Sequence, residues 1–404
     1  MDMQPVDSYL HEIITSIRAL IATEVPVGLA DGAVLAADAT AGWALPGFDN
    51  SAMDGYAVRA ADVAGASPEH PAELPVDGEI AAGDTAARTV GPGRCVRIMT
   101  GALIPDGTDA VVPVEWTDAG TTMVRITQAP AQGNAIRRAG DDAKPGDLLL
   151  PAGTSLGPAQ IGVLAAAGHG VVLARRRPRV TVISTGNELS EPGSPLVPGR
   201  IWDSNSYMLA AAARQAGCET TRHPTLRDDP EAVLAAVAQA ASQADLLITS
   251  GGVSMGGEHD VVKAALSRLG TVTFRKVAMQ PGMPQGFGLI GPEHVPIFTL
   301  PGNPVSAFVS FRLFVAPALC ALQGLPARRQ PIRRARLTAA VRSPQHKRSF
   351  LRGIADIDTG VVTPLTGQSS HQIASLARAN ALIVVPEQVT SLAEGEVVEV
   401  MELP

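Results

Sequence analysis

Asp245 to Gly257 read DLLITSGGVSMGG, which has the pattern of an anion-binding loop. The apolar run 246–248 predicts a buried strand. Glycines follow at positions 251, 252, 256 and 257, and Asp260 then opens a segment with apolar residues at helical spacing. Glycines let the backbone approach a ligand closely, and a helix N-terminus favours negative charge. Because neither the P-loop nor the GxGxxG pattern is matched, the stretch predicts a phosphate-like ligand without identifying it.

The composition is that of a globular protein rather than a disordered one, with 46% hydrophobic and 18% charged residues. Its 404 residues are enough for roughly two to four domains. A net charge of −7 argues against non-specific nucleic-acid binding. Cys95, Cys218 and Cys320 lie far apart, which predicts no disulfide framework and a reducing compartment. We find no signal peptide and no apolar run long enough to span a bilayer, and therefore expect a cytoplasmic protein without a membrane partner.

From residue 178 onward, strand and helix patterns alternate. The expected strands are 179–184, 219–223, 245–249, 272–277, 287–290 and 297–300, and the expected helices are 205–215, 229–241, 261–269 and 304–322. Such alternation predicts a mostly parallel sheet with helices on both faces. Ligands bind beyond the carboxyl ends of such strands. The loops TGNEL, SGGVSMGG, QPGMPQG and LPGNPVS all fall at predicted strand ends, so they should crowd one edge.

The flanking regions have a different character. Apolar spacing predicts one helix from Asp7 to Thr23, capped by Asp7 or Ser8. Short β-prone runs separated by Gly, Pro and Asp, from Val27 to about Pro151, predict an inserted β-rich domain. The region 333–402 is again β-like and predicts a small barrel or sandwich.

Acidic residues gather at the expected carboxyl edge. Glu188 follows the first strand, Asp203 precedes the next helix, Asp228 and Asp229 lie at a helix start, and Asp260 opens the glycine-loop helix. Each position taken alone is typical of an N-cap or a first helical turn. Carboxylates beside an anion-binding loop would repel the anion unless a divalent cation bridges them. The combination therefore predicts Mg²⁺ and a phosphorylated ligand.

The β-rich part also carries polar loop residues. In PGFDNSAMDGYAV (residues 46–58), Asp49 and Asp54 suit Mg²⁺ coordination, although turn formation is the simpler interpretation from composition. Thr100 and Asp142 are either turn residues or groups that face a phosphate or a metal. The PGNP corner at 301–304 is typical of a tight strand-to-helix turn whatever the function.

Together these stretches resemble one family, the molybdopterin molybdenumtransferases of the MoeA type, which includes the C-terminal domain of gephyrin. The matching pieces are PGFDNSAMDGYAV, MTGALIPDGTDAVV, GDDAKPGDLLLPAGTSLGPAQIGVLAAAGHGVV, VISTGNEL, SNS, LRDDP, ITSGGVSMGGEHD, LPGNPVSAFVSF and SSHQIASLARANALIVVPE. They follow the family's order from Pro46 to Pro386 and so cover nearly the whole chain.

The resemblance implies α/β plus β-rich domains in a dimerising subunit of four parts. These are an elongated domain (1–26 with 147–177), an inserted β-rich domain (27–146), a molybdopterin-binding α/β domain (178–325) and a C-terminal β-barrel (326–404). It also implies Mg²⁺-dependent insertion of molybdate into adenylylated molybdopterin with release of AMP. The active site would be shared between two subunits of a homodimer, and a molybdopterin adenylyltransferase is a possible partner.

The resemblance further implies the site residues. The catalytic set would be Asp54, Thr100 and Asp142 from one subunit facing Glu188, Asp228 and Asp260 from the other. Glu188, Asp228 and Asp260 would hold the metal. Ser250, Gly251 and Gly252 would bind the pterin phosphate, and Gln280, Pro301 and Asn303 would lie in the molybdate region.

One departure from the family pattern concerns charge. Where many members have Lys-Pro-Gly-Lys-Pro, this chain has Gln280 and Met283 in place of the two lysines. A lost charge-assisted hydrogen bond costs about 1.5–3 kcal/mol. Gln280 can still donate a neutral hydrogen bond, Met283 cannot, and the nearby Lys276 or Arg275 could compensate for the lost charge. Asn187, where Asp is frequent, removes one charge beside Glu188.

The departure keeps other functions open. A non-catalytic paralogue that binds the pterin or acts as a scaffold is one alternative, although it would not need the retained acids. Insertion of tungstate is another, which the sequence does not separate from insertion of molybdate. The missing GxGxxG after the first strand argues against a nicotinamide dehydrogenase.

Overall fold

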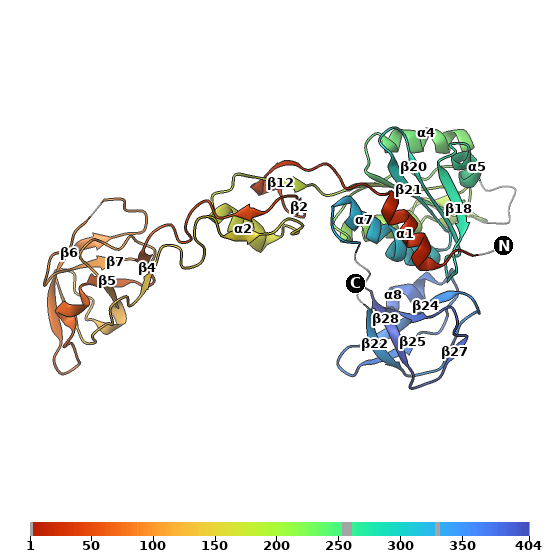
Figure 1. The fold of residues 1–404 in the computed structure, drawn as a ribbon. Coiled ribbons are helices and arrows are strands. Elements are labelled where there is room, and N and C mark those ends of the chain that lie inside the picture. Colours follow the sequence, from red (N-terminus) through yellow and green to blue (C-terminus); the bar gives the residue numbers. More distant parts are fainter. Residues whose placement is uncertain (1–2, 87, 253–260, 328–331, 404) are drawn as a thin grey trace. The chain divides into compact units, whose positions relative to one another are not determined.

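The computed structural model describes residues 3–86, 88–252, 261–327 and 332–403 (Figure 1). The chain divides into two compact units. Unit 1 comprises residues 1–23, 32–36 and 174–404, and unit 2 comprises residues 24–31 and 37–173. The finer division into four domains stays a prediction.

A six-stranded sheet forms the centre of unit 1. Its order is β16 (Glu219–Arg222), β13 (Arg179–Ser184), β17 (Leu246–Ser250), β21 (Val295–Leu300), β20 (Pro284–Ile290) and β18 (Val272–Lys276). The first four strands pair in parallel, whereas β20 is antiparallel to both of its neighbours. Every residue of β17 and β21 is buried, which explains their continuous apolar runs. The expected mostly parallel sheet is confirmed.

Helices cover both faces of this sheet. Successive strand residues point to opposite faces. Ile248 accordingly packs with the helices α1 (Val6–Ser16), α3 (Asn205–Gln215) and α6 (Pro304–Ser310). Leu247 packs instead with α4 (Pro230–Ala241) and α5 (Val261–Ser267). The bounds of α3 agree with the expected helix, and the Asp229 side chain caps α4 by accepting a hydrogen bond from the Glu231 N–H.

The long apolar helix after β21 is a core helix. It runs through α6, a π-helical turn η4 (Phe311–Val315) and α7 (Ala316–Leu322). Pro317 lacks an N–H and its ring opposes the carbonyl of residue 313, so the helix widens there into a π turn. Contrary to the sequence expectation, these 19 residues are long and apolar enough to span a membrane, yet 72% of the apolar window is buried inside the protein.

The N-terminal helix is shorter than its apolar spacing predicts. It ends at Ser16, not at Thr23, and no side chain caps its start at Pro5, so the expected cap by Asp7 or Ser8 is wrong. Ile17 is extended, and the Leu20 N–H then donates to the Leu322 carbonyl at the end of α7 at 2.7 Å. This tertiary hydrogen bond draws the chain out of the helix.

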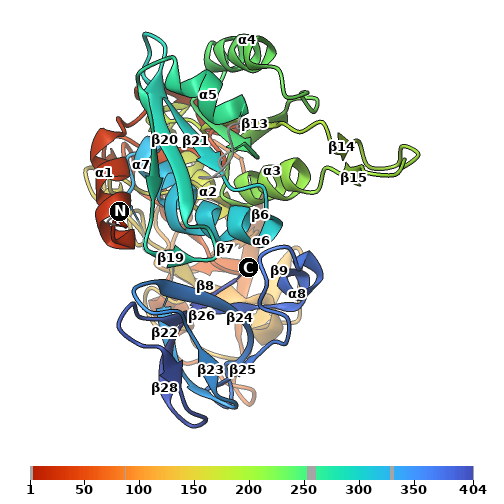
Figure 2. The same ribbon diagram turned by 90° about the vertical axis from the view of Figure 1, so that its right-hand side faces the viewer.

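The C-terminal region is a closed five-stranded barrel. Its strands pair in the ring β24–β25–β22–β28–β26–β24. The strands are β22 (Ile332–Leu337), β24 (Arg348–Asp356), β25 (Val361–Pro364), β26 (Ala381–Val385) and β28 (Val397–Glu402). The short strand β19 (Met279–Gln280), from the α/β part, pairs in parallel with the start of β24. Helix α8 (Ile373–Arg378) packs on both β24 and α6 (Figure 2).

Unit 2 is organised around a second, five-stranded sheet, in agreement with the predicted β-rich character of this region. Its order is β8 (Ala110–Pro113), β5 (Gly55–Val58), β7 (Cys95–Ile98), β6 (Ala72–Ile80) and β9 (Met123–Ile126). Adjacent residues Tyr56 and Ala57 belong to separate apolar clusters, so both faces of the sheet are covered.

Shorter elements complete the chain. They are β1 (Thr23–Pro26), η1 (Val27–Leu29), β2 (Val34–Leu35), β3 (Ala39–Thr40), β4 (Asn50–Ser51), η2 (Ala60–Val63), η3 (Val114–Trp116), β10 (Ile136–Arg137), β11 (Leu148–Leu150), α2 (Pro158–Ala166), β12 (Val171–Arg175), β14 (Leu189–Ser190), β15 (Ile201–Trp202), β23 (Val341–Arg342) and β27 (Ser391–Leu392). Strands β14 and β15 form an arm that projects beside α3 (Figure 2).

Asp245 anchors the start of the central strand β17. Its carboxylate binds the Arg176 guanidinium through two hydrogen bonds of 2.6 and 2.8 Å and also accepts the Arg179 backbone N–H at 2.7 Å. The carboxylate is only 9% exposed. Burial alone would raise the pKa of Asp245, but the hydrogen bonds from Arg176 and Arg179 outweigh it and hold the pKa below its usual value.

We expect Asp245→Ala to lower the free energy of unfolding by about 2–3 kcal/mol at pH 7. This expected loss is smaller than for a fully buried ion pair, because the Arg176 side chain is 42% exposed and would be left in contact with water. The depressed pKa means that this stabilisation is present above the unfolded-state pKa of about 4 and is lost as the pH falls through the folded-state value. The difference in urea unfolding between the two proteins should therefore be largest near pH 7 and shrink as the pH falls below about 4. A difference that stays constant as the pH falls from 7 into the acid range, until the protein unfolds, would contradict this account.

Candidate functional site

The glycine stretch that follows β17 is held closely between neighbouring loops of unit 1. Gly251 has a φ of +97°, and a Cβ built on it would lie 2.8 Å from the Thr185 carbonyl oxygen. Its N–H donates to the Leu300 carbonyl at 3.2 Å. Only glycine fits such a backbone position. Gly252 also has a positive φ, and residues 253–260 of this stretch lie outside the described residues.

Asn205, the first residue of α3, joins two of the strand-end loops. Its Nδ2 donates to the Ser250 hydroxyl at 2.8 Å and to the Gly302 carbonyl at 2.7 Å. Ser250, which is predicted to bind the phosphate, is only 2% exposed, and its hydroxyl is held in place by Asn205. The buried Asn205 Oδ1 has no hydrogen-bond partner in the described structure. Asn205 lies in the SNS motif but is not among the predicted site residues.

The acids on the loops after β13 and β16 have different roles. The Asn187 N–H donates to the Asp228 carboxylate at 3.0 Å, and the Asp228 N–H donates to Asn187 Oδ1 at 3.3 Å. Asn187 therefore orients Asp228 directly. The Glu188 carboxylate folds back over Gly186, where an added Cβ would lie 2.6 Å from it. Asp203 is only 1% exposed and accepts hydrogen bonds from Ser184, Ser206 and Thr225, so its role is structural.

Next to the PGNP corner lies a polar cavity of about 430 Å³. The loop 279–284 and the start of α6 line one side, and the barrel lines the other. The lining residues are Met279, Gln280, Pro281, Gly282, Met283, Pro284, Pro301, Asn303, Ser306, Lys347, Gln368, Ser369 and Ser370. Asn303 Nδ2 donates to the Ser370 hydroxyl at 3.0 Å, and the Val305 N–H donates to the Ser370 carbonyl at 3.1 Å. The structure thus brings Gln280, Pro301 and Asn303 together.

The barrel's contribution to this cavity was missed by the sequence analysis. Behind the cavity, Arg352 is fully buried and donates to the carbonyls of Gly367 and Ser369 at 2.5 and 3.1 Å. Burial lowers the pKa of Arg352. No described carboxylate pairs with Arg352, so its charge is balanced by these two carbonyls and by the Ser375 hydroxyl, to which its Nε donates at 3.2 Å. The polar SSHQ segment is the signal that could have indicated these residues.

The cations expected to replace the family lysines lie elsewhere. Arg275 pairs with Glu12 of α1 at 3.3 Å. Lys276 ends β18, paired with Pro284, and is absent from the described cavity lining. The compensation expected from these two residues is therefore wrong for this cavity.

In unit 2, Asp54 and Thr100 form a bonded pair. Asp54 Oδ1 accepts hydrogen bonds from both the N–H and the hydroxyl of Thr100, each at 2.7 Å. The Thr100 side-chain and backbone hydrogen bonds hold the pKa of Asp54 below its ordinary value. Both residues are exposed, so the ionised carboxylate faces solvent.

The other two acids of unit 2 lie on the adjoining loops. Asp49 binds the Ala139 N–H at 2.8 Å and the Arg138 guanidinium at 2.5 Å, which lower its pKa and use both oxygens. The interpretation of Asp49 as a local turn residue is therefore wrong, because its carboxylate binds groups about ninety residues away in sequence. Asp142 is exposed, and its N–H donates to the Leu45 carbonyl at 2.8 Å. No described hydrogen bond links Asp142 to Asp54 or Thr100.

The described residues contain no cluster of three His, Cys, Asp or Glu side chains that could hold a metal. Glu188 and Asp228 supply two exposed carboxylates on neighbouring loops, and Asp260 lies outside the described residues. Mg²⁺ is commonly held by one or two carboxylates together with substrate phosphates. The donor set present thus fits Mg²⁺ that arrives with a phosphorylated ligand.

Comparison with known proteins places this arrangement in a family. A family model for the MoeA N-terminal region (domains I and II) matches residues 4–168, one for a probable molybdopterin binding domain matches 181–321, and one for the MoeA C-terminal region (domain IV) matches 334–403. Two solved structures of a molybdopterin biosynthesis MoeA protein from Pyrococcus horikoshii are similar over 99–100% of both chains. Their TM-scores are 0.79 and 0.77 at 33% and 28% identity.

Curated relatives agree. Molybdopterin molybdenumtransferase 2 of Mycobacterium tuberculosis (strain H37Rv) is 46% identical over 407 residues, covering 99% of this chain and all of the relative. Molybdopterin molybdenumtransferase 1 of the same organism is 38% identical, covering 98% of both. The Bacillus subtilis molybdopterin molybdenumtransferase is 37% identical, covering 91% of this chain and 86% of the relative. The chain therefore belongs to the MoeA family of molybdopterin molybdenumtransferases, enzymes of molybdenum cofactor biosynthesis.

Proposed function

We propose that this enzyme inserts molybdate into adenylylated molybdopterin and releases AMP, in a Mg²⁺-dependent reaction. The proposal rests on one observation: the loops with the acids and glycines and the loop with the PGNP corner lie at the same edge of the sheet and are joined by Asn205. The acids and glycines after β13, β16 and β17 suit a phosphorylated pterin, and the polar cavity suits an oxyanion. Asn205 joins the two regions by binding both Ser250 and Gly302.

The reaction balances without a further reactant. Two pterin thiols replace one oxygen of molybdate, forming two Mo–S bonds and one water. One water is consumed when the phosphoanhydride to the adenylyl group is cleaved, which gives the pterin phosphate and AMP. The protein has only to bind, orient and neutralise the anionic groups, and preorganised hydrogen-bond donors serve this purpose.

In this proposal each region has its own substrate group. Ser250, Gly251 and Gly252 bind the pterin phosphate, and Gln280, Pro301 and Asn303 lie around molybdate. Glu188, Asp228 and Asp260 hold Mg²⁺, which would neutralise the phosphate charges when bound. We also propose a cytoplasmic homodimer in which Asp54, Thr100 and Asp142 of one subunit complete the site of the other, supplied with substrate by a molybdopterin adenylyltransferase.

AMP release from adenylylated molybdopterin tests this function. We expect release that requires both molybdate and Mg²⁺, that stops when EDTA removes the metal, and that returns on adding Mg²⁺. Tungstate in place of molybdate shows whether the site separates the two oxyanions. Tight binding of the pterin without molybdate-stimulated release would instead support a non-catalytic binding or scaffold protein.

A further inference from the structure

The arm formed by β14, β15 and the loop between them presents a tryptophan to solvent (Figure 2). Trp202 is 49% exposed and is the only tryptophan in the sequence of unit 1. Tryptophan is highly buried on average in folded proteins. A half-exposed indole offers a large flat apolar face, and its position in the fold decides what this face can bind.

The backbone places Trp202 beside the acid that the proposed function assigns to Mg²⁺. Strands β14 and β15 pair in parallel, with Leu189 opposite Ile201 and Ser190 opposite Trp202. The Ile201 N–H donates to the Glu188 carbonyl at 2.8 Å. Trp202 therefore lies one residue further along the same pairing, next to the place where the metal would meet the substrate phosphates.

The arm also carries a cation to this place. The Arg200 guanidinium donates to the Leu189 carbonyl at 3.3 Å, which keeps this exposed side chain close to Glu188. Aromatic side chains bind nucleobases by stacking, and arginine binds phosphate through charge-assisted hydrogen bonds. An indole, a guanidinium and carboxylates suited to Mg²⁺ are together the groups that recognise a nucleoside monophosphate.

Hydrogen bonds fix both the indole and the base of the arm. Trp202 Nε1 donates to the Ser194 carbonyl at 3.2 Å. The Glu191 carboxylate binds the Arg222 guanidinium through two hydrogen bonds of 2.9 Å and accepts the Tyr207 hydroxyl at 2.9 Å. Arg222 also lies 4.0 Å from the centre of the Tyr207 ring, so one face of that ring is already covered. A preorganised indole orders a planar base at a lower entropic cost.

The order of the loops along the sheet edge indicates which end of the substrate reaches the arm. Strands β13, β17 and β21 are neighbours in this order. In the proposed function the loop after β17 binds the pterin phosphate, and the corner after β21 lies around molybdate. Adenosine, the phosphates and the dithiolene follow one another along the substrate. The loop after β13, which carries the arm, is therefore left for the adenosine.

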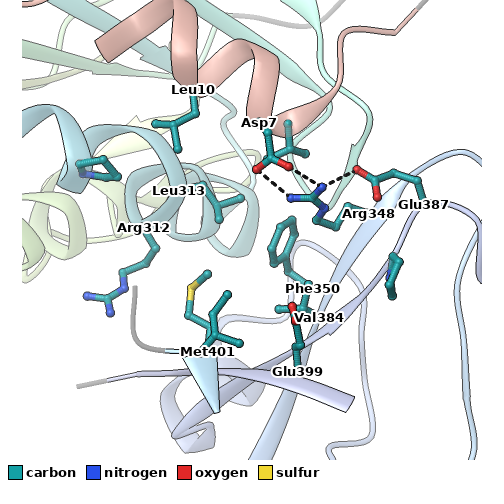
Figure 3. A pocket seen from close by; sticks show the side chains of 14 residues that line it. Asp7, Leu10, Arg312, Leu313, Arg348, Phe350, Val384, Glu387, Glu399 and Met401 are labelled. Carbon is teal, nitrogen blue, oxygen red and sulfur yellow. Dashed lines mark hydrogen bonds and ion pairs between the residues drawn. The ribbon is translucent and has the colours of Figure 1, made fainter. Parts of the chain in front are cut away.

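Another cavity of unit 1 is less suited to an aromatic base. It has a volume of about 300 Å³ and lies between α1, η4, α7 and the barrel (Figure 3). Its aromatic lining residue, Phe350, is only 2% exposed. The Arg348 guanidinium binds both carboxylate oxygens of Asp7, at 3.2 and 2.9 Å, and Glu387 at 2.9 Å. The Phe350 ring and the Arg348 cation are thus already engaged, whereas the Trp202 ring is half exposed.

We propose that Trp202 stacks on the adenine base of the adenylylated substrate and of the AMP product, with its ring held in place by the Ser194 carbonyl. This inference rests on the proposed function, because that function supplies the adenylylated substrate. Trp202 then determines specificity for the nucleotide end of the substrate, and the PGNP corner receives the metal end.

The test compares Trp202→Leu, which removes the aromatic face, with Trp202→Phe, which keeps one. Stacking of a base on an aromatic side chain corresponds to about a 5- to 100-fold change in affinity. We expect Trp202→Leu to raise the Kd for AMP by that factor and to leave the Kd for ribose 5-phosphate, which lacks the base, within about twofold. The KM for adenylylated molybdopterin should rise and the KM for molybdate should stay the same.

Two further variants separate stacking from a structural role of the indole. Trp202→Phe loses the hydrogen bond to the Ser194 carbonyl but should keep most of the affinity for AMP. Ile201→Ala is the matched control, because this neighbour on β15 is 57% exposed and points to the opposite face of the strand. It should bind AMP as wild type does. A structural role would instead weaken AMP and ribose 5-phosphate alike in Trp202→Leu and Trp202→Phe, and would overturn the proposal.

Calorimetry and fluorescence with AMP alone distinguish failure of this inference from failure of the proposed function. At saturating AMP, quenching of tryptophan fluorescence in the wild type that is missing in Trp202→Leu supports stacking, even if no AMP release from the pterin is observed. Equal affinity for AMP in the two proteins, together with equal KM for adenylylated molybdopterin, would overturn the role of Trp202 even if the wild type is an active transferase.

Discussion

Asp228→Asn is expected to lower kcat/KM for AMP release by about 10²–10³-fold, the usual effect of removing one preorganised electrostatic group. The change keeps the shape of the side chain, and an amide oxygen can still accept the Asn187 N–H that now binds the carboxylate at 3.0 Å. Only the charge is lost. Since we propose that Asp228 holds Mg²⁺, the Mg²⁺ concentration for half-maximal activity should rise in the same variant.

The neighbouring acid supplies the control. Asp229 caps α4 through the Glu231 N–H at 3.0 Å, so Asp229→Ala should cost about 1 kcal/mol of stability and leave kcat/KM almost unchanged. The two acids are adjacent and equally charged, so a general loss of negative potential would affect both variants alike. Wild-type activity and Mg²⁺ dependence in Asp228→Asn would remove this residue from the metal site.

Much of the α/β part could be predicted because its signals are local. Asn205–Gln215 has the predicted bounds, and Asp229 caps its helix, since apolar spacing and N-cap residues lie within the element itself. The end of α1 could not be predicted in this way. The apolar spacing continues past Ser16, but the Leu20 N–H binds the Leu322 carbonyl, about three hundred residues away in sequence.

The same distinction holds for the candidate site. Parallel strands bring their carboxyl ends to one edge, so the loops with Glu188, Asp228 and Gly251 could be placed together from sequence. Lys347 and Ser370 could not, because they reach the cavity only through the pairing of β19 with β24 and through the Asn303–Ser370 hydrogen bond. The SSHQ segment indicates polar residues but not the contact of Ser370 with Asn303, and no local pattern indicates the pairing of β19 with β24. A compensating cation was therefore expected at Lys276 or Arg275, which lie closer in sequence to Gln280.

The second large effect is recovery of activity when two inactive variants are combined. Asp54→Ala removes the carboxylate that binds the N–H and hydroxyl of Thr100, and we expect it, like Asp228→Asn, to be folded and almost inactive. If each site takes Asp54 from one subunit and Asp228 from the other, a mixed dimer has one intact site and one doubly altered site. Random mixing makes half of the dimers mixed, so about a quarter of the wild-type activity should return.

The recovered activity distinguishes a site that is shared between two subunits from a site that lies within one subunit. Co-expression with two different tags isolates mixed dimers, and these should reach about half of the wild-type activity because one of two sites is intact. If instead both residues act within one subunit, every site in a mixed dimer lacks one of them and no activity returns. A control that combines Asp54→Ala with Thr100→Val should stay inactive in either case, because both changes affect the same half of the site and no combination restores it.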